Sequence, residues 1–97
     1  MNAVTRIIAE RTLIAIEDGR EVEVRVVIGQ PERFTEGNGY YCPFQITGTG
    51  SGRVKYAGGV DSVQSLQLAM KMIGVILACT GKAIKWPLSD EGTGFEA

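Results

Sequence analysis

The sequence contains no histidine and only two cysteines, Cys42 and Cys79. Histidine is the commonest general base near neutral pH and the commonest metal ligand in proteins. Two cysteines without histidine are too few for a zinc site, and neither thiol has an imidazole to activate it as a nucleophile. We therefore predict that the protein is not an enzyme and that it has no catalytic, metal-binding or cofactor-binding residues.

An excess of charge of one sign is also missing. Ten Lys and Arg residues face eleven Asp and Glu residues, which gives a formal net charge of -1. Such a balance provides no long-range attraction to nucleic acid or to a membrane surface. Residues 1–13 lack the unbroken apolar core of a secretory signal, because Arg6, Glu10 and Arg11 interrupt it. Nothing else indicates secretion, so we expect free thiols and a cytoplasmic protein that does not span a membrane.

The 97 residues, of which 44% are hydrophobic, suffice for a single domain over residues 1–97, with a glycine-rich tail at 87–97. Two β-rich runs between residues 5 and 30 flank the segment 17–20 and predict a β-hairpin. Ile14 and Ile16 have the same parity as the valines of the second run, which favours a three-residue loop, 17–19, with Gly19 in the left-handed conformation. A two-residue Asp-Gly turn would instead set Val22 opposite Ala15 and Val24 opposite Leu13.

Two further strands and one helix are predicted after the hairpin. Residues 40–47 alternate between apolar and polar, and residues 53–57 form a short fourth strand with Val54 and Tyr56 facing inward. Asp61 then supplies an N-cap, with Gln64 three residues later, for a helix over 61–80. Residues 83–86 fit a short C-terminal strand or an extended arm. The fold class is α+β, with a four-stranded antiparallel meander and one long helix packed on one face.

The predicted helix is apolar on two sides. Its main stripe, which we expect to face the sheet, consists of Val63, Leu66, Ala69, Met70, Ile73, Ile76 and Leu77. A second set at i, i+4, i+7 and i+11, named the helix ridge here, consists of Leu68, Met72, Val75 and Cys79. A helix that is apolar on nearly all sides is usually buried on nearly all sides. We expect the helix ridge to form a homodimer interface; the alternative is a cover made by the C-terminal arm with Ile84, Trp86, Leu88 and Phe95.

The outer face of the sheet is the second candidate surface. If the strands pair in sequence order, odd-numbered positions bring together Arg11, Arg25, Tyr41, Gln45, Arg53 and Lys55. Basic residues with an aromatic ring on an open sheet suit single-stranded nucleic acid, through phosphate pairing and base stacking. Glutamates on the same side dilute this charge. The alternative function is therefore nucleic-acid regulation through Arg11, Arg25, Tyr41, Arg53 and Lys55, and the competing interpretation is a solvated polar face.

The segment Tyr56–Met70, YAGGVDSVQSLQLAM, together with Cys42-Pro43-Phe44, resembles a family of small bacterial proteins of unknown function. That resemblance implies a bacterial origin and no assigned activity. The order of four strands and then a helix also resembles the single-stranded DNA-binding transcriptional coactivator fold, whose members dimerise through that helix. We expect a homodimeric, non-enzymatic interaction domain whose partner is a second copy or another protein.

Overall fold

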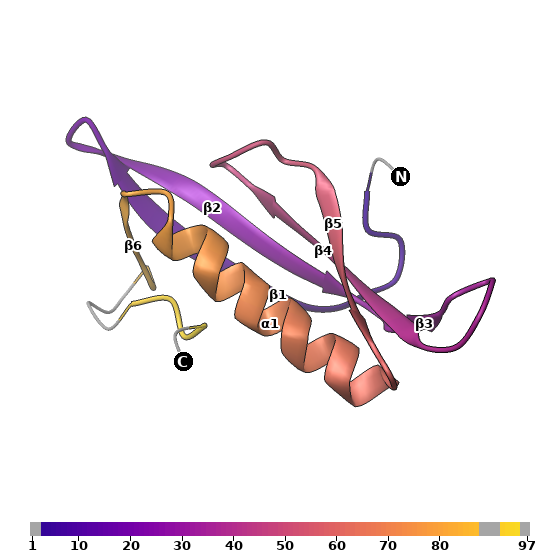
Figure 1. The fold of residues 1–97 in the computed structure, drawn as a ribbon. Helices are drawn as coiled ribbons and strands as arrows, with labels where there is room; N and C mark the ends of the chain where they lie inside the picture. The colour runs from indigo at the N-terminus through magenta and orange to yellow at the C-terminus, as the bar shows by residue number, and fades with distance from the viewer. Residues whose placement is uncertain (1–2, 88–91, 96–97) are drawn as a thin grey trace.

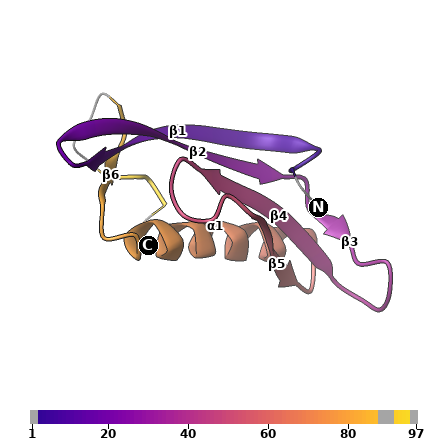
Figure 2. The ribbon, with the colours of Figure 1, turned by 90° about the horizontal axis from the view of Figure 1, so that it is seen from above.

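The computed structural model describes residues 3–87 and 92–95. Its strands form one antiparallel sheet, and a single helix lies across one face (Figures 1 and 2). In chain order the elements are β1 (Ile7–Glu17), β2 (Arg20–Gly29), β3 (Glu32–Arg33), β4 (Tyr40–Thr47), β5 (Val54–Gly59), α1 (Ser62–Ala78) and β6 (Ala83–Lys85). The predicted α+β class with one helix and an antiparallel sheet is confirmed.

The four longer strands pair in sequence order, β1 with β2, β2 with β4, and β4 with β5. Two short strands raise the number in the sheet to six. β3 lies beside the start of β4. β6 pairs with Ile14–Ile16 of β1, where the sequence indicated a short C-terminal strand. On that side, no described strand pairs with the first half of β1.

The hairpin between β1 and β2 has a two-residue turn. Glu17 pairs with Arg20, and both turn residues have positive φ, 51° at Asp18 and 76° at Gly19. These angles belong to the turns whose twist matches that of the flanking strands, and Asp-Gly is a preferred pair for them. The expected three-residue loop is therefore wrong. The structure sets Val22 opposite Ala15 and Val24 opposite Leu13.

This register decides which residues of β1 enter the core. Leu13 and Ala15 are 0% and 1% exposed, whereas Ile16, which was expected on the buried face, is 38% exposed. Both faces of β1 carry apolar residues, so apolar parity alone could not identify the buried one. The observed pairing of β1 with β2 differs by one residue from the pairing that a three-residue loop would give. Because side chains alternate along a strand, this difference places every side chain of β1 on the face opposite to the expected one.

In β5, too, the side chains face opposite to the predicted sides of the sheet. Tyr56 pairs with Pro43 on the open face of the sheet, and Ala57 pairs with buried Cys42 on the helix side. The prediction that Val54 and Tyr56 face inward is wrong. The end of this strand passes close to the helix: a Cβ on Gly59 would lie 2.6 Å from the backbone nitrogen of Ser65. A side chain at position 59 would therefore clash with the first turn of α1.

Helix α1 begins where its capping residues predicted. The carboxylate of Asp61 accepts a hydrogen bond from the amide of Gln64 at 2.8 Å, and the side-chain oxygen of Gln64 accepts one from the amide of Val60 at 2.7 Å. These two bonds satisfy amides that have no partner within the helix. The cap fixes the direction in which α1 leaves β5 and crosses the sheet.

The helix packs mainly on β4 and β5, and its buried face consists of Ser65, Ala69, Ile73 and Leu77. Four members of the predicted stripe lie outside this face. Val63 is 61% and Met70 42% exposed, and Leu66 and Ile76 are half-buried. The buried face is narrower than the stripe because the sheet lies on one side of the helix only. Figure 2 shows α1 as a separate layer, and none of the described residues forms a helix on the opposite face.

The segment Ser62–Cys79 is long and apolar enough to match a membrane span, with a mean hydropathy of 1.4. A core helix of a globular protein meets the same criterion, and Ala69 and Ile73 are fully buried against the sheet. Only 22% of the segment is buried, however. Most residues of this apolar helix are therefore not buried, and α1 is a candidate binding surface.

Candidate functional site

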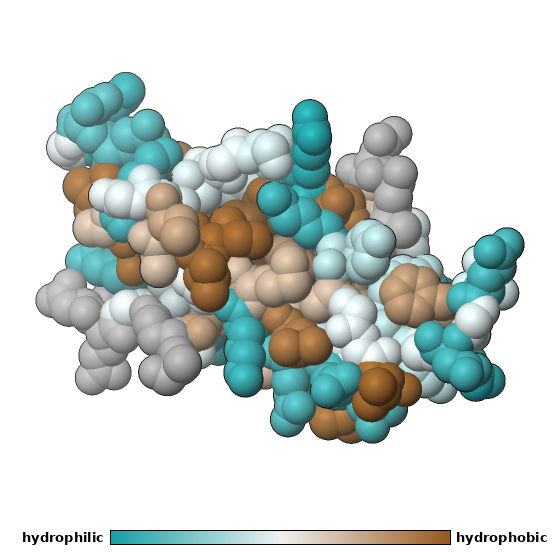
Figure 3. All heavy atoms as spheres, viewed as in Figure 1, coloured by the Kyte–Doolittle hydropathy of each residue, from teal (hydrophilic) through white to brown (hydrophobic). Residues whose placement is uncertain are grey.

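The helix ridge is open to solvent. Leu68 is 36%, Met72 37% and Val75 62% exposed, and Cys79 is exposed as well. Figure 3, which views the molecule from the helix side, shows brown apolar atoms along α1 interrupted by teal polar ones. The sequence identified these four residues as one row, and the structure places them on one uncovered flank of the helix. Their role as a dimer interface stays a prediction.

The C-terminal arm does not cover the helix ridge in the part of the chain that the structure describes. Ile84 lies in β6 opposite Ala15, and Phe95 lies against the other flank of α1. A Cβ on Gly74 would come within 2.5 Å of the backbone oxygen of Phe95, so the arm needs a glycine at this contact. Leu88, the remaining apolar residue assigned to this cover, lies outside the described residues.

Arg11 holds the arm in place. Its guanidinium carbon lies 4.0 Å from the ring centroid of Trp86 and 5.1 Å from that of Phe95. One of its nitrogens donates a hydrogen bond to the backbone oxygen of Thr93 at 3.0 Å. Stacking of a guanidinium on aromatic rings is favourable, especially where water is partly excluded. This residue therefore connects β1 to the arm.

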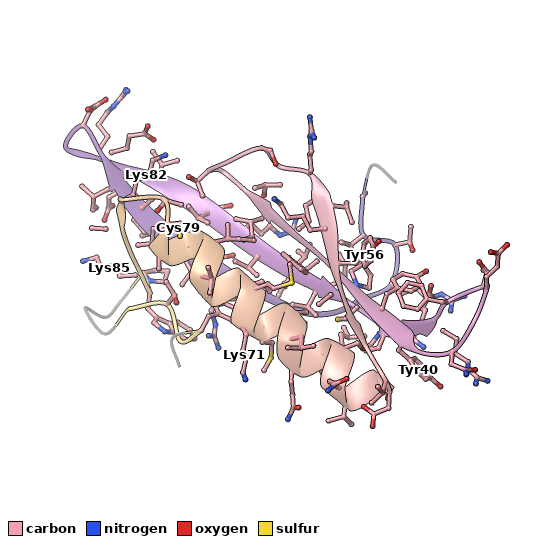
Figure 4. All side chains as sticks on the ribbon, in the orientation of Figure 1. Tyr40, Tyr56, Lys71, Cys79, Lys82 and Lys85 are labelled. Carbon is pink, nitrogen blue, oxygen red and sulfur yellow. The ribbon has the colours of Figure 1, made fainter. Side chains whose placement is uncertain are left out.

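A groove of about 1000 Å³ lies between α1, the first half of β1 with the facing part of β2, and the arm. Its apolar walls include Val26, Ile28, Met70, Val75, Ala78 and Phe95. Lys71 also lines the groove, and Figure 4 shows its side chain leaving the middle of α1 on the side of the arm. Sequence reasoning missed this groove, because it depends on the register of β1 and on the return of residues 92–95.

The structure divides the five residues predicted to form a nucleic-acid face. Arg25 and Tyr41 lie on the open face, whereas Arg11 pairs with buried Val26 and Lys55 with buried Phe44 on the helix side. Arg53 is exposed just before β5, and its amide donates to the hydroxyl of Ser51. The expectation that they share one face is wrong, because the shifts in β1 and β5 turned Arg11 and Lys55 over.

Three aromatic rings gather on the open face, a cluster that sequence reasoning did not find. The ring centroids of Phe34, Tyr41 and Tyr56 lie 5.3 to 6.3 Å apart. Tyr56 is 60% exposed. The correct register of β5, with Tyr56 beside β4 on the open face, would have revealed the Tyr41–Tyr56 pair.

Carboxylates dominate the electrostatics of the open face. Strand pairing places four of them there, Glu10, Glu21, Glu23 and Glu32. Arg25 forms an ion pair with Glu10, and the hydroxyl of Tyr41 donates a hydrogen bond to Glu32 at 2.9 Å. This hydrogen bond, burial and the charge of the carboxylate together raise the pKa of Tyr41. The face is therefore aromatic but not basic.

The two cysteines are free and differ in environment. Cys42 is 0% exposed, and its thiol donates a weak hydrogen bond to the backbone oxygen of Gly29, with sulfur and oxygen 3.4 Å apart. Burial raises the pKa of Cys42. Cys79, by contrast, lies exposed on the helix ridge. Within residues 3–87 and 92–95, no group of three or more Cys, Asp or Glu side chains is placed to hold a metal ion.

The fold and these surfaces define a small α+β domain with an open apolar helix. The chain belongs to the family described as a domain of unknown function (DUF6968), whose model matches residues 9–97. The resemblance to an uncharacterised protein family is thereby confirmed. No curated protein and no solved structure matches the chain.

Proposed function

We propose that this protein is a non-enzymatic binding domain of the bacterial cytoplasm that acts as a homodimer through the helix ridge. The observation that supports the proposal is the exposure of Leu68, Met72, Val75 and Cys79 on one flank of α1. Soluble monomers seldom expose large contiguous apolar patches, and where such patches occur they commonly mark interaction sites.

The geometry of the helix ridge suits a two-fold contact. The row extends over eleven residue steps, from Leu68 to Cys79, which corresponds to roughly 16 Å along a helix axis. A two-fold interface uses the same patch on both subunits, so an apolar row can meet its own copy without a complementary partner. Met72 lies in the middle of the row and is the best residue at which to disturb it.

Sedimentation velocity of the wild type, Met72→Asp and Gln67→Asp tests the proposal. Gln67 is exposed on the same helix but lies outside the helix ridge, so its variant adds the same charge elsewhere on α1. We expect the wild type and Gln67→Asp to sediment as dimers at tens of micromolar, and Met72→Asp to sediment as a monomer. Equal behaviour of the two variants would show that the helix ridge is not the contact.

A second candidate is single-stranded nucleic-acid binding on the open face. The cluster of Phe34, Tyr41 and Tyr56 favours it, because exposed aromatic rings provide stacking platforms for bases. The carboxylates on this face oppose it. Fluorescence anisotropy with a labelled oligonucleotide at low salt provides the test, with Tyr56→Ala as the variant and Tyr40→Ala, on the helix side, as its control. Absence of binding at low salt would dismiss this function.

A further inference from the structure

The groove beside α1 has the size and the walls of a ligand site. Its volume of about 1000 Å³ lies at the upper end of the range for small-molecule pockets. Val26 and Ile28 form part of its floor and are 0% and 4% exposed, so the floor is continuous with the hydrophobic core. Met70 and Phe95 line its sides. An apolar chain placed here would remove from water the exposed surface of Met70 and Val75, which are 42% and 62% exposed.

Two cations lie at this groove, and neither has a carboxylate partner among residues 3–87 and 92–95. Lys71 and Arg11 both line it, and the ion pairs of the described chain involve other basic residues. Arg11 donates to the arm, but a guanidinium has five donor hydrogens and one such bond leaves others. Among the described lining residues the one acidic residue is Glu10, and its side chain is paired with Arg25 on the open face of the sheet. The charge of the described lining therefore favours an anionic group.

We propose that the groove binds a long-chain carboxylate of the fatty-acid class. Its alkyl chain lies along the apolar walls, and its carboxylate meets the ammonium of Lys71 at the surface of α1. Both parts of the ligand are needed to match the groove, since the walls are apolar and the unpaired charges are positive. This assignment does not depend on self-association, because Val75 is the one residue of the helix ridge that also lines the groove.

Isothermal titration calorimetry with dodecanoate, held below its micelle-forming concentration, tests the assignment. The uncharged and cationic comparisons are dodecanol and dodecyltrimethylammonium, which have the same chain length. Lys71→Gln removes the proposed carboxylate partner, and Lys55→Gln, on the far edge strand, is the matched control. Ala9→Phe fills part of the groove from β1, where Ala9 is exposed and lines it.

We expect saturable binding of dodecanoate to the wild type and to Lys55→Gln. An exposed ion pair contributes about 0.2 to 1 kcal/mol, so Lys71→Gln should weaken binding by a factor of about 1.4 to 5. Ala9→Phe should abolish it, while circular dichroism shows an unchanged fold. Repeating the titration on Met72→Asp separates the groove from dimerisation: binding there supports the assignment even if the protein proves to be a monomer.

Three results would overturn the assignment. The first is the absence of saturable binding in the wild type. The second is equal affinity of Lys71→Gln and Lys55→Gln, because the carboxylate would then not meet Lys71. The third is binding of dodecyltrimethylammonium as tight as that of dodecanoate, which would show that the groove does not select an anion.

Discussion

Helix α1 carries two apolar rows with opposite surroundings. Ala69 and Ile73 are fully buried against the sheet, whereas Met72 and Val75 of the helix ridge are 37% and 62% exposed. The residues differ little in hydrophobicity; the rows differ in whether the domain has an element to pack on them. The spacing of apolar residues thus identifies both rows, but it does not reveal which of them the domain itself covers.

The largest expected effect is on stability. Ile73→Ala should lower the free energy of unfolding by about 2 to 5 kcal/mol, because it leaves a cavity under the helix where Ile73 is 0% exposed. Met72→Ala should change it by less than about 0.5 kcal/mol. Urea denaturation at submicromolar protein concentration, where association contributes little, measures both. Similar losses in the two variants would mean that the helix ridge is part of the monomer core.

Cysteine reactivity offers a second comparison between core and helix ridge. Cys79 is exposed, whereas Cys42 is fully buried and burial raises its pKa. Because the thiolate is the reactive form, Cys79 should react with a thiol reagent at pH 8 in the native state, and Cys42 only after unfolding. Mass spectrometry of the alkylated protein distinguishes them. Slower labelling of Cys79 at higher protein concentration would place it in a contact between copies.

A smaller effect is expected on the open face of the sheet. The hydrogen bond that Tyr41 donates to Glu32 raises the pKa of Tyr41 above its ordinary value of 10.0. The associated stability is present below the pKa of the unfolded chain and is lost as the pH rises through the higher folded pKa. Ultraviolet titration should show one tyrosine ionising late, and Glu32→Gln should remove this delay. A wild-type titration without a late tyrosine would contradict the hydrogen bond.

Local signals in the sequence predicted the elements of the fold but not every register. The cap at Asp61 and Gln64 located the start of α1, and the alternation in β2 identified a strand. The register of β1 was wrong because Ile14 and Ile16 offered a second apolar face, and the preference of Asp-Gly for a two-residue turn outweighed that parity. In β5, the proximity of the helix, which no local pattern reveals, placed Ala57 inside and Tyr56 outside.

The candidate surfaces also differ in whether local sequence signals are sufficient to identify them. The helix ridge depends only on spacing along one helix, so the sequence was sufficient to identify it. The groove requires three distant segments, β1, α1 and residues 92–95, and the aromatic cluster requires β3 to lie beside β4. Arg11 illustrates the difference: predicted as part of a nucleic-acid face, it instead contacts Trp86 and Phe95 on the helix side.

The molar mass of the wild-type protein in solution is the most direct test of the central claim. Sedimentation equilibrium from one to a hundred micromolar should show a mass that rises toward twice the 10.4 kDa of the chain. A mass that stays at 10.4 kDa over this whole range would contradict the proposal that the helix ridge joins two copies of the protein.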